Sequence, residues 1–184
     1  LNDLGENPAM WTLLEKEARA ASNLSHPHVV HIFSFGKIRG RPYIVMEMVL
    51  AGSLDDRLRG KGPLPEAEAI QVGIDVMEGL RAANQVELLH GDIKPANIIL
   101  TPRGDAKVAD FGLARFHEDR TVVERWGTPY YIAPEKSLQR QEDFRSDLYS
   151  LGATLFHVVS GYPPFNGETA EEVVKKSLRK KTPR

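Results

Sequence analysis

The sequence contains no cysteine. This absence excludes disulfide bonds, thiolate nucleophiles and metal sites built on cysteine. No run of apolar residues approaches the roughly 20 that a membrane-spanning helix needs, and the first residues lack the pattern of a signal peptide. Neither sign of charge dominates, because 24 lysines and arginines stand against 25 aspartates and glutamates, for a net charge of −1. The composition therefore gives no reason to expect a nucleic-acid or membrane partner.

Length and composition indicate a globular domain. The chain has 184 residues, of which 41% are hydrophobic and 27% are charged, as in an ordinary folded protein. This length is enough to bury a sizeable core and suggests about one domain. We find no internal repeat, low-complexity segment or linker.

The residues that point most clearly to chemistry lie in the stretch HGDIKPANIIL, residues 90–100. It places a carboxylate, an ammonium group and an amide close together, at Asp92, Lys94 and Asn97, and a second carboxylate follows at Asp110. One carboxylate can accept a proton from an attacking hydroxyl, while the other and the amide bind Mg²⁺. The lysine can neutralise charge on a transferring phosphoryl group. This set of side chains predicts the handling of a metal-bound phosphate.

Four short motifs follow one another along the chain: HGD at 90–92, DFG at 110–112, GTPYYIAPE at 127–135 and SDLYSLG at 146–152. HGD or DFG alone is more often an ordinary turn. Chance assembly of the whole series falls below about 1%. The series resembles the catalytic domain of the eukaryotic-type serine/threonine protein kinases, and its last part is similar to bacterial members of that family.

The resemblance implies an α+β, two-lobed protein-kinase fold. Residues 1–49 would form a partial N-lobe of one helix and two strands (the fourth and fifth of the family) that ends in the hinge. Residues 50–184 would form a mostly helical C-lobe that lacks its last helices. No glycine-rich loop and no Val-Ala-x-Lys strand precede Glu17. We therefore expect the chain to be truncated at both ends and to be inactive when isolated.

By the same resemblance, the predicted reaction is transfer of the γ-phosphoryl group of ATP to serine and threonine hydroxyls of a protein. Asp92 would deprotonate the hydroxyl and Lys94 would contact the γ-phosphate. Asn97 and Asp110 would bind Mg²⁺, with Mn²⁺ as an alternative metal. Thr128 would form a hydrogen bond near Asp92 and Lys94 and favour serine and threonine acceptors. Because the phosphoryl donor would be ATP, we expect a cytoplasmic reaction, and a longer parent protein could still be tethered to a membrane.

The resemblance also assigns the nucleotide pocket. Glu17 would pair with a lysine of the N-lobe, although a solvated glutamate is the simpler interpretation of that residue alone. Met46 would stand at the gatekeeper position, and the backbone of Glu47 and Met48 would bond the adenine edge from the hinge. Both methionines also suit the core of a strand. Ile99 would form the floor under the adenine.

Hydrophobic spacing and capping residues predict the remaining elements. Within the helix expected over 65–86, Ile70, Ile74, Met77 and Leu80 would form the stripe that faces the core. Asp147 would either cap the helix over 148–160 or hold the catalytic loop through backbone hydrogen bonds, as it does in the family. The predicted helices cover 8–24, a short segment after Ser53, 65–86, 148–160 and 169–181. The predicted strands cover 29–35, 42–48, 88–89, 98–100 and 106–108.

One departure from the family concerns regulation. Position 91 is glycine where many members carry an arginine that pairs with a phosphate on the activation segment. We therefore expect activity to depend weakly on phosphorylation of Thr121, the only hydroxyl residue between Leu113 and Gly127. Thr121→Ala would leave the rate nearly unchanged.

Three other interpretations are weighed against a kinase. A pseudokinase scaffold or interaction module is disfavoured because the chemical residues of the C-lobe are present. Small-molecule phosphotransferases also carry an HGD motif, but they generally lack a lysine at the position of Lys94 and the segment 127–135. A metal site from His26, His28 and His31 is disfavoured because two of them would face opposite sides of a strand and no acidic or thiolate ligand completes the set.

Overall fold

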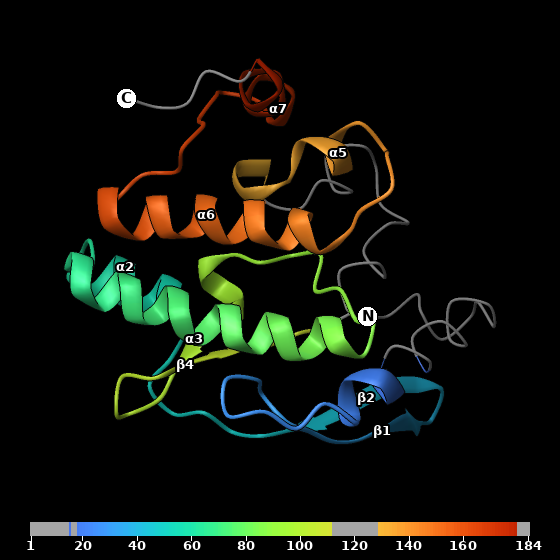
Figure 1. Cartoon of the computed structure of the whole chain (residues 1–184). Coiled ribbons are helices and arrows are strands. Elements are labelled where there is room, and N and C mark those ends of the chain that lie inside the picture. The colour runs from blue at the N-terminus through green and yellow to red at the C-terminus, as the bar shows by residue number, and fades with distance from the viewer. Residues whose placement is uncertain (1–14, 16–17, 112–128, 180–184) are drawn as a thin grey trace.

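The computed structural model describes residue 15 and residues 18–111 and 129–179. Its strands form two separate antiparallel pairs, β1 with β2 and β3 with β4, and most of the rest is helical. In Figure 1, α3 and α6 run side by side through the middle of the molecule. The β1–β2 hairpin lies beyond α3, and α5 and α7 lie beyond α6. This arrangement agrees with the predicted α+β architecture.

The bounds of the elements follow the chain. The strands are β1 (Ile32–Ile38), β2 (Arg41–Met46), β3 (Ile98–Leu100) and β4 (Ala106–Val108). The helices are α2 (Leu54–Lys61), α3 (Glu66–Gln85), α5 (Pro134–Ser137), α6 (Phe144–Ser160) and α7 (Ala170–Leu178), with short 3₁₀ turns η1 (Pro95–Asn97) and η3 (Pro129–Tyr131). Among the described residues, no helix combines the length and the hydrophobicity that crossing a lipid bilayer requires.

The β1–β2 hairpin closes later than predicted. Its turn consists of Arg39 and Gly40, with φ of 52° and 79°, as a two-residue type I′ turn requires. The predicted start of the first strand at Val29 is wrong because residues 28–30 pair with β4 instead. Val30 N–H donates to Val108 O at 2.9 Å, and Val108 N–H donates to His28 O at 2.9 Å. This exchange ties the hairpin to the strand that leads to Asp110.

Capping residues set the start of several helices, as the sequence predicts. Ser53 caps α2 in a reciprocal capping box with Asp56, and Thr169 caps α7 by accepting a hydrogen bond from Glu172 N–H. Pro65 precedes the first residue of α3. The predicted short strand at 88–89 is wrong, since those residues form no strand.

The buried face of α3 differs from the predicted stripe. Ile70, Ile74 and Met77 are 55%, 48% and 37% exposed and line a shallow apolar groove of about 480 Å³ beside α6. The buried face consists mostly of smaller residues, namely Ala69, Val72, Asp75, Val76, Gly79, Leu80 and Ala83. At Gly79 a Cβ would lie 2.7 Å from His28 O, so the backbone of residues 28–29 approaches α3 too closely for a larger residue. The predicted core stripe is therefore wrong except at Leu80.

Helix α6 begins four residues earlier than residue 148, the predicted start. Asp143 is its N-cap and accepts a hydrogen bond from Arg145 N–H. Asp147 already lies inside the helix and is 2% exposed. The interpretation of Asp147 as the cap is therefore wrong, and its carboxylate is free to act elsewhere.

Candidate active site

The loop that carries Asp92 is held from below by α6. The backbone N–H groups of His90 and Gly91 donate to Asp147 Oδ2 at 2.9 Å and Oδ1 at 2.8 Å. Because Asp147 sits on a long buried helix, these two bonds fix the loop to the rigid part of the molecule. The predicted role of Asp147 in holding the catalytic loop is confirmed.

The His90 side chain joins this loop to the segment before Asp110. Its Nδ1 accepts a hydrogen bond from Asp92 N–H at 3.1 Å, so the ring proton must lie on Nε2, which donates to Ala109 O at 2.8 Å. The ring also packs edge-on against Phe111, with centroids 4.8 Å apart. His90 is 1% exposed, so one buried side chain sets the relative positions of both loops.

The structure brings Asp92, Lys94 and Asn97 together, as predicted. Asp92 Oδ2 accepts hydrogen bonds from Lys94 Nζ at 2.6 Å and from Asn97 Nδ2 at 3.1 Å. Asn97 Nδ2 also donates to Asp92 O at 2.8 Å. These contacts orient the carboxylate through Oδ2 and do not involve Oδ1.

Asn97 and Asp110 have the chemistry of a hard metal site. Asn97 is 8% exposed, and its amide nitrogen donates to Asp92, so its Oδ1 is the side-chain atom that could bind a metal ion. Ala109 N–H donates to Asn97 O at 2.9 Å, so Asp110 directly follows a residue bonded to Asn97. Asp110 is exposed and has φ of +62°, a conformation that aspartate tolerates better than most residues. Amide and carboxylate oxygens are the ligands that Mg²⁺ prefers.

Met46 and Asp110 meet at the same small cavity. This cavity of about 10 Å³ is lined by the apolar residues around Met46 together with Asp110 and Phe111. Ala21, from the helical residues 18–22, also lines it. Glu17, which is predicted to pair with a lysine and precedes Ala21 by about one helical turn, lies outside the described residues. Thr121 and Thr128 also lie outside them. The helix after Glu17 therefore reaches the side of the site where the sequence predicts the nucleotide.

The predicted hinge follows β2 directly. Glu47 N–H donates to His31 O at 2.8 Å, so among the backbone groups of Glu47 only its carbonyl remains for a ligand. Met48 is 81% exposed and lies outside β2, and its interpretation as strand core is therefore wrong. Met46, the last residue of β2, is 39% exposed and is only partly in the core.

The Glu47 carboxylate connects the hinge to β4. Its oxygens lie 2.8 and 2.9 Å from Lys107 Nζ, and Oε2 also accepts a hydrogen bond from His31 N–H. Partial burial acts to raise the pKa of Glu47, but the hydrogen bonds from Lys107 and His31 outweigh it and hold that pKa below its usual range. Ile99 pairs with Lys107 across β3 and β4, so their side chains share one face of the sheet. Ile99 therefore lies on the same face of the sheet as Lys107, the residue that Glu47 contacts.

Sequence reasoning missed Lys107 and a second lysine, Lys136. Lys136 Nζ donates to Gly91 O at 2.8 Å and lies 3.5 Å from Glu142 Oε2. Lys107 stands between the buried residues Ala106 and Val108 on β4. This alternation indicates that the Lys107 side chain lies on the opposite face of the strand from its two buried neighbours. Its partner, Glu47, is 60 residues away in the sequence and is identified only by the fold.

Two of the three histidines for which a metal site is disfavoured have other contacts. His26 Nδ1 accepts a hydrogen bond from His28 N–H at 3.2 Å. His28 Nδ1 lies 2.9 Å from Ala106 O and 3.7 Å from Asp75 Oδ2. His28 thus joins this segment to α3 and β4, and His26 contacts the backbone of His28.

Comparison with known proteins shows which family this chain resembles. The family described as "Protein kinase domain" matches residues 4–183. The chain is 39% identical over 183 residues to a Clostridium perfringens protein designated a probable serine/threonine-protein kinase, covering 98% of the chain and 27% of that protein. It is 36% identical over 185 residues to serine/threonine-protein kinase PknB of Mycobacterium leprae, covering 96% of the chain and 30% of PknB. It is 35% identical over 176 residues to serine/threonine-protein kinase PknL of Mycobacterium tuberculosis, covering 94% of the chain and 44% of PknL. The chain thus spans less than half the length of each relative.

Proposed function

Because the chain belongs to the protein kinase family, we propose that it transfers the γ-phosphoryl group of ATP to serine and threonine hydroxyls of protein substrates. The single observation that carries this proposal is the oriented carboxylate of Asp92. Lys94 and Asn97 both bind its Oδ2, and the loop around it is fixed by Asp147. Three side chains thus orient one carboxylate, which supports its proposed role as the general base.

The proposed mechanism assigns one task to each side chain. Asp92 Oδ1 accepts the proton of the substrate hydroxyl as it attacks. Lys94 neutralises negative charge on the transferring group, and Asn97 and Asp110 supply the oxygen ligands for Mg²⁺ or Mn²⁺. A metal ion held by these two residues would supply positive charge that offsets the negative charge developing on the phosphate. Thr128 contributes to the choice of serine and threonine acceptors.

The nucleotide would bind between the hinge and β3. The carbonyl of Glu47 and the backbone of Met48 would bond the adenine edge, with Met46 behind the base and Ile99 beneath it. Glu17 would pair with a lysine of the N-lobe. In this proposal residues 1–49 belong to the N-lobe and residues 50–184 to the C-lobe. The reaction would take place in the cytoplasm, where ATP is available.

Transfer of labelled γ-phosphate from Mg-ATP to a mixed protein acceptor tests the proposal. The chain is assayed alone and within the longest natural protein that contains it, since the relatives are much longer. We expect label on serine and threonine from the longer protein, in which Asp92→Asn lowers kcat by about 10²–10⁴-fold. Asp105→Asn, which changes an exposed aspartate in the turn before β4, is the matched control and leaves kcat unchanged.

The same assay separates an enzyme from a scaffold. Binding of a fluorescent ATP analogue is measured on the protein and on Asp110→Asn, a change that removes a charge and keeps a residue type suited to positive φ. Nucleotide binding without any transfer would contradict the proposed reaction and favour a pseudokinase scaffold. Transfer to an aminoglycoside or choline, and not to protein, would favour a small-molecule phosphotransferase.

A further inference from the structure

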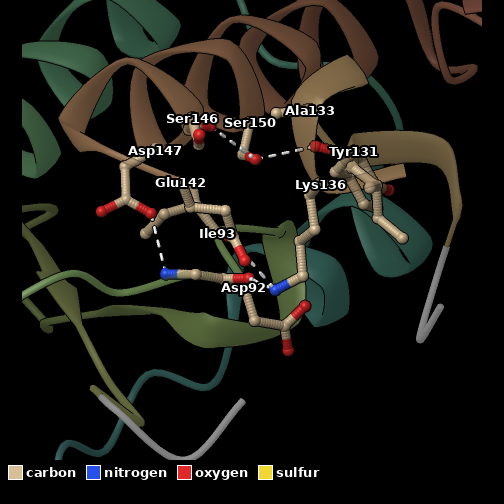
Figure 2. Close-up of a pocket in the computed structure, with 11 residues that line it drawn as sticks. Asp92, Ile93, Tyr131, Ala133, Lys136, Glu142, Ser146, Asp147 and Ser150 are labelled. Atoms are coloured by element: carbon tan, nitrogen blue, oxygen red, sulfur yellow. Dashed lines mark hydrogen bonds and ion pairs between the residues drawn. The ribbon is translucent and has the colours of Figure 1, made fainter. Parts of the chain in front are cut away.

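Lys136 lies outside the motifs that carry the proposed chemistry, yet it reaches the catalytic loop. It belongs to α5, and its Nζ donates to Gly91 O at 2.8 Å across 45 positions of sequence. Figure 2 shows the side chain extending from α5 to the backbone beside Asp92, while Asp147 approaches the same loop from α6. The lysine side chain is 24% exposed, so its position is set by packing as well as by charge.

The hydrogen bond from Lys136 completes the fixation of one peptide group. The peptide between Gly91 and Asp92 carries the Gly91 carbonyl and the Asp92 N–H, and it is planar. The carbonyl accepts from Lys136, and the N–H donates to His90 Nδ1 at 3.1 Å. Both ends of the plane are therefore held by side chains, and its orientation sets the backbone from which Asp92 projects.

This fixation matters because residue 91 is glycine. Glycine has no Cβ and samples more backbone conformations than any other residue, and here it adopts φ of +75°. The residue itself therefore does little to restrict the Gly91–Asp92 peptide. Asp147 accepts hydrogen bonds from the N–H groups of His90 and Gly91, whereas the Gly91 carbonyl accepts one from Lys136.

Glu142 supports the lysine without replacing this contact. Its Oε2 lies 3.5 Å from Lys136 Nζ, farther than the 2.8 Å to Gly91 O. An ammonium group has three donors, so it can bind both partners at once. A hydrogen bond from a charged donor is also stronger than one between neutral groups.

We propose that Lys136 is a positioning residue that holds the Gly91 carbonyl and thereby orients Asp92. The proposal rests on the proposed function, because its effect on rate assumes that Asp92 is the base. Lys136 also connects the segment from Pro129 to α5 with the catalytic loop. A change in the conformation of that segment would therefore alter the orientation of Asp92.

The kinetic test uses the form of the protein that transfers phosphate. Lys136→Met keeps the length of the side chain and removes its donors, and we expect kcat to fall about tenfold because the base is misplaced. KM for ATP and for the protein acceptor stays within about twofold, since the effect is on orientation of the base and not on binding. Lys136→Arg keeps the charge and recovers most of the rate. Lys176→Met is the matched control, because Lys176 also donates to a backbone carbonyl, that of Asn166 at 2.7 Å, but from α7.

A double-mutant cycle separates positioning from a general loss of structure. If Lys136 acts through Asp92, then Lys136→Met lowers kcat by less than about twofold when Asp92→Asn is already present. A loss that multiplies fully with that of Asp92→Asn would overturn the proposal.

Hydrogen exchange of the 184-residue chain gives a measurement that needs no activity. In Lys136→Met we expect the amides of Gly91 and Asp92 to exchange about tenfold faster while those of α3 keep their protection, and Lys176→Met changes neither. Unchanged exchange at these amides would overturn the proposal. Faster exchange in a protein that never transfers phosphate would support the role of Lys136 in the loop and contradict the proposed function.

Discussion

Asp143 and Asp147 are four positions apart at the start of α6 and have different tasks. Asp143 caps the helix at an exposed position, whereas Asp147 is buried and accepts the N–H groups of His90 and Gly91. A buried carboxylate that binds two backbone amides cannot be removed without leaving both donors unsatisfied. Both residues are aspartates at the start of α6, so their different roles come from their different surroundings, one exposed and one buried.

Asp147→Ala should therefore lower the free energy of unfolding by about 3–5 kcal/mol, because it leaves buried donors without an acceptor. Asp143→Ala is the control on the same helix and should cost clearly less, since water can replace an exposed cap. Urea unfolding followed by circular dichroism measures both. Equal losses for the two variants would contradict the assignment of Asp147 to the loop.

At the scale of the element, the close contact between α3 and residues 28–29 depends on Gly79. Glycine inside a helix normally costs about 0.5–1 kcal/mol relative to alanine. At position 79 the packing nevertheless requires glycine, because a Cβ there would lie 2.7 Å from His28 O and 3.3 Å from Val29 Cγ2. The helix and the backbone pairing of residues 28–30 with β4 are thus packed against each other without room for a methyl group.

Gly79→Ala should destabilise the chain by about 1–3 kcal/mol through overpacking. Gly152 provides the control, because it lies inside α6 and a Cβ added there would meet no atom within 4 Å. Gly152→Ala should stabilise the chain by up to about 1 kcal/mol. Thermal unfolding of both variants gives the comparison, and a stabilising Gly79→Ala would show that the segment 28–29 can move away from α3.

At the scale of the whole molecule, Tyr131 and His157 join the segment after Thr128 to α6. Tyr131 OH lies 2.6 Å from His157 Nδ1, and the two rings stack. Burial, and then the charge of Asp55, raises the pKa of the Tyr131 phenol. The phenol therefore stays protonated and donates a hydrogen bond to His157 Nδ1. Burial lowers the pKa of His157, which Asp55 opposes only in part.

Acid should therefore destabilise this connection. In the unfolded chain His157 has the ordinary histidine pKa near 6.5, whereas in the folded chain its pKa is lower. The contribution of His157 to the free energy of unfolding is therefore fully present above about pH 6.5 and is lost as the pH falls below that value. Urea unfolding between about pH 5 and pH 7.5 should show a steeper loss for the natural chain than for His157→Gln, whose amide can still accept from Tyr131. Other histidines are present in both proteins, so parallel curves would contradict this role for His157.

The candidate site could be predicted from the sequence to the extent that its chemistry is local. Asp92, Lys94 and Asn97 lie within one short loop, so their spacing alone brings the side chains together. The starts of α2, α3 and α7 were also predictable, because a cap such as Ser53 or Thr169 acts on residues only a few positions away. These features depend on contacts between near neighbours in the chain.

Packing and long-range pairing decided the rest. Hydrophobicity favours the large residues Ile70 and Ile74 as the core of α3, but the close approach of residues 28–29 selects the face that carries Gly79 instead. The contact of Lys136 with Gly91 and that of Lys107 with Glu47 join segments 45 and 60 positions apart, and no local pattern encodes them. The sequence by itself thus determined which groups could do chemistry and where helices begin. Only the tertiary structure decided which faces are buried and which distant side chains hold those groups in place, because such contacts depend on how the elements pack together in space.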